Sequence, residues 1–120
     1  MMKFKWTTLR VSNLDTSLKF YRDTLKMKIA SQFGTEDHKI VMLGEDDEAK
    51  IELICEKGKS IDNPGNGVSI GMEVAHLDDM INTLKEQNIR VEGPIMPNQH
   101  IRFFFVKDPD GYTIQLLEEL

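Results

Sequence analysis

The stretches VSNLDTSL at residues 11–18 and VAHLDDMI at residues 74–81 share one pattern and lie 63 residues apart. Each opens with a valine that can end a strand, and each passes through a polar turn into the apolar spacing of an amphipathic helix. The same separation places KIELI at 50–54 onto TIQLL at 113–117. Two matched blocks in the same order and at one spacing indicate an internal duplication.

Each copy is predicted to contain a strand, a helix and three further strands. Asn13 is well suited to cap the first helix, whereas His76 is a weaker cap for the second. The first copy is predicted to have strands at 4–11, 27–33, 38–43 and 49–56 and a helix at 14–25. The second is predicted to have strands at 67–74, 89–93, 100–106 and 112–118 and a helix at 77–88. DPDGY at 108–112 is a tight-turn signal, so the last two strands should form a hairpin.

These elements predict one α+β domain over residues 1–120, built from two tandem βαβββ modules. The modules are expected at 1–58 and 66–120, with the turn-rich residues 59–65 as the linker between them. Eight strands are expected to form a curved, partly open barrel with the two main helices outside it. One face of the sheets would then be covered by helices and the other would line a trough.

Composition narrows the class of protein. Hydrophobic residues make up 40% of the chain and charged residues 29%, which is typical of a globular domain. The net charge of −5 argues against nucleic acid as a partner. No apolar run is long enough to span a membrane, and the N-terminus carries no signal-peptide pattern. The single cysteine, Cys55, has no disulfide partner within the chain, so we expect a cytoplasmic protein.

Strand alternation assigns a set of residues to the uncovered face. Trp6 and Thr8 alternate with the apolar side chains of the first strand, and Glu52 does so in the fourth. The duplication makes Ser69 the counterpart of Trp6, and Gln115 the counterpart of Glu52. A pseudo-twofold axis would bring such pairs together, so we expect the site there.

Two more candidates lie on the strand that follows His100. If Arg102 and Phe104 point into the trough, Arg102 could clamp an anion at its mouth. The alternatives are a solvated arginine and a phenylalanine in the core, because Phe103, Phe104 and Phe105 alternate between the two faces.

Three segments carry a family resemblance: WTTLRVSNLDTSLKFYRDTLKM (6–27), KIELI (50–54) and FFFVKDPDGYTIQLLEE (103–119). Together they resemble the vicinal oxygen chelate superfamily, which includes glyoxalase I, bleomycin-resistance and fosfomycin-resistance proteins and extradiol dioxygenases. The resemblance covers essentially the whole chain. It implies a glyoxalase-like fold and a homodimer whose clefts often draw residues from both subunits.

The resemblance also implies where metal ligands would lie. Members that act on metal-bound substrates carry His or Glu at the positions occupied here by Trp6, Glu52, Ser69 and Gln115. Only Glu52 is a conventional strong ligand, because an indole N–H has no lone pair to offer and the other two side chains are neutral. We therefore expect a degenerate metal site and no metal cofactor. His38 or His100 could supply missing ligands, although a solvated histidine is the simpler interpretation of each.

The resulting prediction is a glyoxalase/bleomycin-resistance-like protein that binds a small organic molecule in the trough without metal. Ligand contacts are predicted for Trp6, Thr8, Glu52, Ser69, Arg102, Phe104 and Gln115. One alternative is a metal-dependent lyase, isomerase or transferase of glyoxalase type with non-standard ligands. Another is an inactive structural or regulatory relic in which Trp6 plugs the trough. The expected partners are the small molecule and a second copy of the chain, with no nucleic acid and no membrane.

Overall fold

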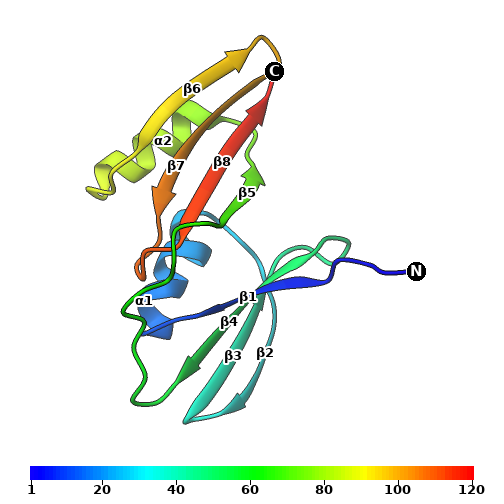
Figure 1. The fold of residues 1–120 in the computed structure, drawn as a ribbon, viewed down its shortest axis with the longest axis vertical. Coiled ribbons are helices and arrows are strands. Elements are labelled where there is room, and N and C mark those ends of the chain that lie inside the picture. The colour runs from blue at the N-terminus through cyan, green and yellow to red at the C-terminus, as the bar shows by residue number, and fades with distance from the viewer. The chain divides into compact units, whose positions relative to one another are not determined.

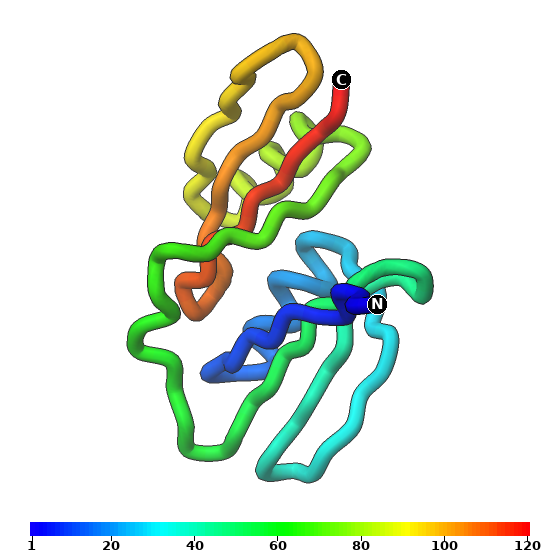
Figure 2. Tube along the Cα trace, turned by 45° about the vertical axis from the view of Figure 1, so that its right-hand side comes forward, coloured from blue at the N-terminus to red at the C-terminus, as the bar shows by residue number.

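The computed structural model describes residues 1–120, which divide into two compact units, Met1–Asp62 and Asn63–Leu120. The division falls inside the stretch predicted as the linker, residues 59–65. The colour gradient in Figure 2 shows that each unit is one continuous run of chain, blue to green in the first and green to red in the second. No helix of either unit has both the length and the apolar character needed to cross a lipid bilayer.

The first unit is a four-stranded sheet with one helical segment. Its elements are β1 (Trp6–Arg10), α1 (Leu14–Leu18), the π-helical turn η1 (Lys19–Thr24), β2 (Ile29–Thr35), β3 (His38–Leu43) and β4 (Lys50–Glu56). The strand order is β1-β4-β3-β2, with β1 parallel to β4 and the other neighbours antiparallel. This is the predicted βαβββ order (Figure 1).

The second unit repeats that plan. Its elements are β5 (Ser69–Glu73), α2 (Leu77–Glu86), β6 (Glu92–Asn98), β7 (Ile101–Lys107) and β8 (Thr113–Glu119). The strand order is β5-β8-β7-β6, with β5 parallel to β8, and α2 lies against one face of this sheet (Figure 1). The α+β class and all eight strands are confirmed. The strands form two sheets of four that no strand pair joins, so they are not closed into a barrel.

The duplication extends to the pairing of individual residues. Thr8 pairs with Glu52 between β1 and β4, and Gly71 pairs with Gln115 between β5 and β8. On the other side of the same residues, Met42 pairs with Glu52 and Phe105 pairs with Gln115. Every one of these positions is displaced by the repeat spacing found in the sequence, so the two sheets share one register.

The cores lie on the helix-covered faces, as alternation predicts. In the first unit the buried sheet residues are joined by buried side chains of the helical segment: Leu9, Val41, Leu43, Ile51 and Leu53 with Leu18, Phe20 and Tyr21. In the second unit the corresponding set is Phe104, Val106, Ile114 and Leu116 with Leu77, Ile81 and Leu84. Each such side chain contributes roughly 1.5–3 kcal/mol of transfer free energy when buried.

The first helix differs from the regular α-helix predicted for residues 14–25. After Leu18 it continues as the π-helical turn η1, in which the Leu25 N–H donates to the Phe20 carbonyl at 2.9 Å. The wider turn brings Phe20 and Thr24 into the buried set. The left-handed residue that ends each helix is Lys26 in the first unit and Asn88 in the second. Lys26 and Asn88 are separated by one residue fewer than the repeat spacing. The first helical segment is therefore one residue longer than α2, and the π turn accommodates that extra residue.

The position of β6 also differs from the prediction. A strand was expected near residues 89–93, and β6 instead covers Glu92–Asn98, including Pro94 and Pro97. Proline lacks the N–H that a central strand must donate, so it is disfavoured in the middle of a sheet. β6 is an edge strand with irregular pairing to β7, and edge strands tolerate proline.

Candidate functional site

The uncovered face of the first sheet brings together three predicted site residues. Thr8 and Glu52 are directly paired, and the Thr8 hydroxyl donates to Glu52 Oε1 at 2.6 Å. Trp6 lies two residues before Thr8 on the same face and is 50% exposed. The hydrogen bond orients the Glu52 carboxylate and occupies one of its oxygens. We call this pair the Thr8–Glu52 latch.

A shallow pocket lies beside the exposed indole. Its volume is ≈ 210 Å³, and it is lined by Phe4, Trp6 and Met42 together with the acidic loop at residues 46–48. Met42 pairs directly with Glu52, so the pocket borders the latch. The aromatic and thioether side chains give this edge of the face an apolar surface next to charged groups.

The uncovered face of the second sheet has the same layout with different chemistry. Gln115 lies between Gly71 on β5 and Phe105 on β7. A β-carbon at position 71 would lie 3.3 Å from Gln115 Oε1, so glycine leaves a notch beside the amide. No residue of the chain hydrogen-bonds the Gln115 side chain, whereas its counterpart Glu52 is held by Thr8. Ser69 is exposed on the same face, two positions from Gly71.

The prediction that Arg102 and Phe104 line the uncovered face is wrong. Phe104 is 0% exposed and pairs with the core residue Leu116, so it packs on the helix-covered side. Arg102 lies on the same side, where its Nη2 donates to Asp78 Oδ1 at 2.9 Å. This hydrogen bond lowers the pKa of the Asp78 carboxyl, and the arginine charge adds to the shift. Arg102 therefore anchors the start of α2 to β7.

Of the three phenylalanines of β7, Phe103 and Phe105 share the face with Gln115. Their rings meet edge to face with centroids 5.6 Å apart, forming an aromatic surface beside the free amide. The sequence contained a signal for these positions, because the repeat spacing carries Ile40 onto Phe103 and Met42 onto Phe105.

The histidines lie away from Glu52 and Gln115 along their sheets. His38 pairs with Glu56 at the far end of the first sheet, and His100 is exposed in the turn before β7.

The pKa of Glu56 is lowered chiefly by its hydrogen bond to Lys59, with a smaller contribution from Arg10. No group of three or more His, Cys, Asp or Glu residues suited to holding a metal ion occurs in the structure.

Comparison with known proteins places the chain in a family. Residues 3–116 match the model of the Glyoxalase/Bleomycin resistance protein/Dioxygenase superfamily. A lactoylglutathione lyase of Haemophilus influenzae is 31% identical, and the match covers 98% of this chain and 93% of that protein. A lactoylglutathione lyase of Oryza sativa is 33% identical over 92% of this chain, which corresponds to 42% of that longer protein.

Solved structures agree with the fold. The trypanothione-dependent glyoxalase I of Leishmania major superposes with a TM-score of 0.84 at 27% identity, covering 98% of this chain and 87% of that one. An antibiotic binding protein of Streptomyces sp. CB03234 superposes with a TM-score of 0.74 at 18% identity, covering 100% of this chain and 98% of that one. The second likeness concerns the fold alone. The chain therefore belongs to the Glyoxalase/Bleomycin resistance protein/Dioxygenase superfamily.

Proposed function

We propose that this protein binds a small organic molecule on its uncovered sheet faces without the help of a metal ion. The residues assigned to the ligand are Trp6, Thr8 and Glu52 in the first unit and Ser69 and Gln115 in the second. The observation that carries the proposal is the Thr8–Glu52 latch. Glu52 is the one strong metal-ligand type among the four positions that hold metal in the family, and its carboxylate here accepts a hydrogen bond from Thr8 at 2.6 Å.

The chemistry of the donor set does not fit a catalytic divalent metal. Such a site takes about three ligands of the His, Glu or Cys type and keeps one position open. Trp6 has only an N–H donor, Ser69 offers a weak neutral oxygen, and Gln115 offers a neutral carbonyl oxygen. One carboxylate with neutral neighbours provides too little charge to retain Zn²⁺ or Ni²⁺.

The same residues suit an organic ligand. Half of the Trp6 surface is exposed beside a pocket of ≈ 210 Å³, so a flat molecule can stack on it. The free amide of Gln115 has a donor and an acceptor available, and Phe105 provides an apolar surface directly beside it. Polar groups next to exposed aromatic rings are typical of small-molecule sites.

Metal analysis tests the proposal directly. Protein purified without chelators should contain no stoichiometric divalent metal, and titration with Ni²⁺, Zn²⁺ or Mn²⁺ should give no saturable heat. Glu52→Gln and Glu36→Gln, a control on an exposed turn, should behave alike in this titration. Stoichiometric metal that is lost in Glu52→Gln alone would refute the metal-free site.

The chain contains one tryptophan, so its indole fluorescence reports on the first uncovered face alone. We expect saturable quenching by at least one flat probe among proflavine (a cation), 2-naphthol (neutral) and 2-naphthoate (an anion). Free N-acetyl-tryptophanamide, titrated with the same probes, supplies the baseline for non-specific quenching of an indole. An unchanged signal with all three probes would instead favour an inactive relic in which Trp6 plugs the trough.

A second candidate function is a metal-dependent glyoxalase-type lyase with non-standard ligands. The relatives named lactoylglutathione lyase, 31–33% identical over at least 92% of this chain, favour it. Lactoylglutathione lyase activity should then appear after loading with Ni²⁺ or Zn²⁺ and disappear in Glu52→Gln. Absence of activity with every metal, together with saturable quenching of Trp6, would decide for the binding protein.

We also propose that the protein is a cytoplasmic homodimer. The uncovered sheet faces carry large exposed apolar side chains, including Trp6 and Phe33 in the first unit and Ile95 in the second. Large apolar side chains exposed on a sheet face favour association with a second copy, because association removes their surface from water. Light scattering coupled to size-exclusion chromatography should give twice the 13.8 kDa mass of the chain. A monomer at micromolar concentration would contradict this part of the proposal.

A further inference from the structure

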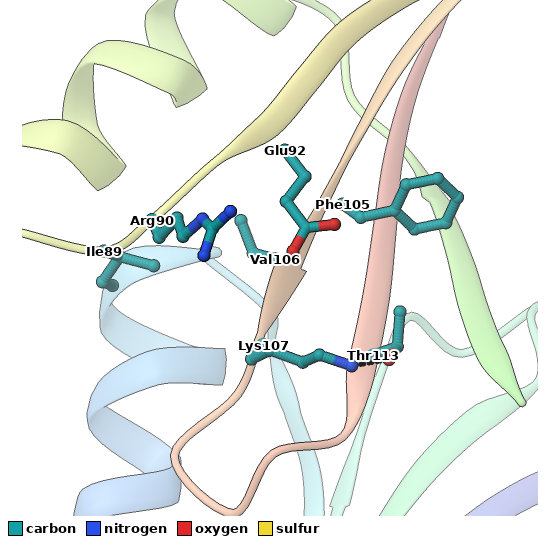
Figure 3. Close-up of a pocket in the computed structure, with 7 residues that line it drawn as sticks. All are labelled: Ile89, Arg90, Glu92, Phe105, Val106, Lys107 and Thr113. Atoms are coloured by element: carbon teal, nitrogen blue, oxygen red, sulfur yellow. Dashed lines mark hydrogen bonds between the residues drawn. The ribbon is translucent and has the colours of Figure 1, made fainter. Parts of the chain in front are cut away.

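A pocket of ≈ 180 Å³ in the second unit contains none of the five residues assigned to the ligand above and shares only Phe105 with the surface beside Gln115. Its lining comes from four segments of the unit: Ile89 and Arg90 after α2, Glu92 on β6, Phe105, Val106 and Lys107 on β7, and Thr113 on β8. Figure 3 shows Arg90 and Glu92 reaching into it from neighbouring positions, and Lys107 extending across it to Thr113. All seven residues belong to one compact unit, Asn63–Leu120.

The charges in this pocket do not neutralise one another. Arg90 and Glu92 carry opposite charges two residues apart, yet no ion pair joins them and neither has another hydrogen-bond partner. Lys107 has no carboxylate partner either, but its Nζ donates to the Thr113 hydroxyl at 2.5 Å. Two cations and one carboxylate therefore face the same small volume, and the position of one cation is fixed by Thr113.

The remaining lining is apolar. Phe105 is half-buried and lines the pocket, with its ring extending toward β8 in Figure 3, and Ile89 adds a half-buried aliphatic side chain. The volume is smaller than the roughly 300–1,000 Å³ of sites for drug-sized ligands. The pocket thus combines two cationic side chains that can bind an anion, one carboxylate that can bind a cation, and an apolar surface. Its volume suits a very small metabolite.

We propose that this pocket binds a small zwitterion with an apolar side chain, of the α-amino acid type. The ligand carboxylate would contact Arg90 and Lys107, its ammonium would contact Glu92, and its side chain would lie on Phe105. Hydrogen bonds between ionised partners are about twice as strong as neutral ones, and a guanidinium can hold a carboxylate with two of them. A ligand with both charges gains both sets of contacts, whereas a ligand with one charge leaves the opposite group unpaired.

The test uses the full chain and three probes of similar shape. L-leucine carries both charges, 4-methylpentanoate lacks the ammonium group, and 3-methylbutylamine lacks the carboxylate. Titrations followed by ¹H–¹⁵N correlation spectra should show saturable shifts at the amides of Arg90, Glu92, Lys107 and Thr113 with L-leucine. Each single-charge analogue should bind about tenfold more weakly or worse, which corresponds to about 1.4 kcal/mol.

Substitutions assign the two charges. Glu92→Gln should weaken L-leucine and 3-methylbutylamine but leave 4-methylpentanoate unchanged. Arg90→Gln should do the reverse, weakening L-leucine and 4-methylpentanoate only. Glu86→Gln, on the exposed surface of α2, is the matched control and should change nothing. The spectra themselves report whether each variant is folded, and if one variant fails to fold the other still decides the assignment together with the analogues.

Three results would overturn the proposal: no saturable shift with L-leucine, equal affinity for L-leucine and either analogue, or affinity unchanged in both charge variants. The first result would mean that the charges are only solvated, and the second that the pocket selects an anion or a cation alone. The outcome is independent of the function proposed above, because that function is read from Trp6 fluorescence in the first unit and this one from amide shifts in the second.

Discussion

The two units share a strand register, but they hold the polar residue at the centre of each uncovered face differently. In the first unit Thr8 donates to Glu52, whereas in the second a glycine stands opposite Gln115 and leaves the amide free. The backbone is the same in both places, so the difference arises from two side chains. After a duplication, a few substitutions on a shared backbone are therefore enough to change the central polar residue. In one unit it is hydrogen-bonded within the protein, and in the other it is available to a ligand.

The largest expected difference between the units lies in their cores. The repeat spacing makes Val41 of β3 the counterpart of Phe104 of β7, and both are buried. Phe104→Ala should lower the free energy of unfolding by about 3–5 kcal/mol, because it removes a ring and leaves a cavity. Val41→Ala removes two carbons and should cost about 2 kcal/mol. Urea denaturation followed by circular dichroism measures both, and equal losses would contradict the difference in packing.

The helix starts provide the next comparison. The Asn13 side chain accepts from the Thr16 N–H at 3.0 Å, whereas His76 makes no side-chain cap. Asn13→Ala should therefore cost about 1 kcal/mol, and His76→Ala should be close to neutral. His76→Asn should stabilise the protein, because it supplies the cap that the second helix lacks. Thermal denaturation ranks the three variants, and a destabilised His76→Asn would contradict the comparison.

Substitutions at the Thr8–Glu52 latch and at Gly71 should change the free energy of unfolding differently. Thr8→Val removes the hydroxyl at nearly constant volume and should cost about 0.5–1 kcal/mol, whereas Thr8→Ser retains the hydrogen bond and serves as the control. Gly71→Ala should be neutral or stabilising by up to about 0.5 kcal/mol, because alanine restricts the unfolded chain and the flexible end of Gln115 can move aside. Chemical denaturation measures both effects. A loss above about 1 kcal/mol in Gly71→Ala would show that the notch has no room.

The smallest effect concerns an ion pair of the second unit. Arg102 holds the pKa of Asp78 below its ordinary value, so Arg102→Gln should raise that pKa toward the value of a free aspartate. Because the folded-state pKa is the lower one, the pair's contribution to stability is present above the unfolded pKa. That contribution is lost as the pH falls through the folded pKa. Side-chain carboxyl titration by NMR measures the shift, and an unchanged midpoint would mean that the pair is not formed in solution.

Local patterns in the sequence predicted much of this molecule. The Asn13 cap and the turn at DPDGY rest on interactions between residues close in sequence, and both are confirmed: the Asp108 carboxylate accepts from the Tyr112 N–H at 2.9 Å inside the β7–β8 hairpin. The repeat spacing predicted the order of elements, because a duplicated sequence repeats its hydrophobic pattern. Alternation alone predicted that the candidate residues Trp6, Thr8 and Glu52 lie on one face, and the pairing of Thr8 with Glu52 agrees with this.

The differences from the prediction come from information that neighbouring residues do not contain. The run of three phenylalanines fits either face, and only the pairing of Phe104 with Leu116 buries it and turns Arg102 toward Asp78. The edge position of β6 is what allows its prolines into a strand. The sequence by itself determined the repeated order of elements, because hydrophobic periodicity and turn chemistry are local. Tertiary pairing decided which side chains of β7 face the core and left Gln115 free, because the choice of face depends on partners distant in the chain.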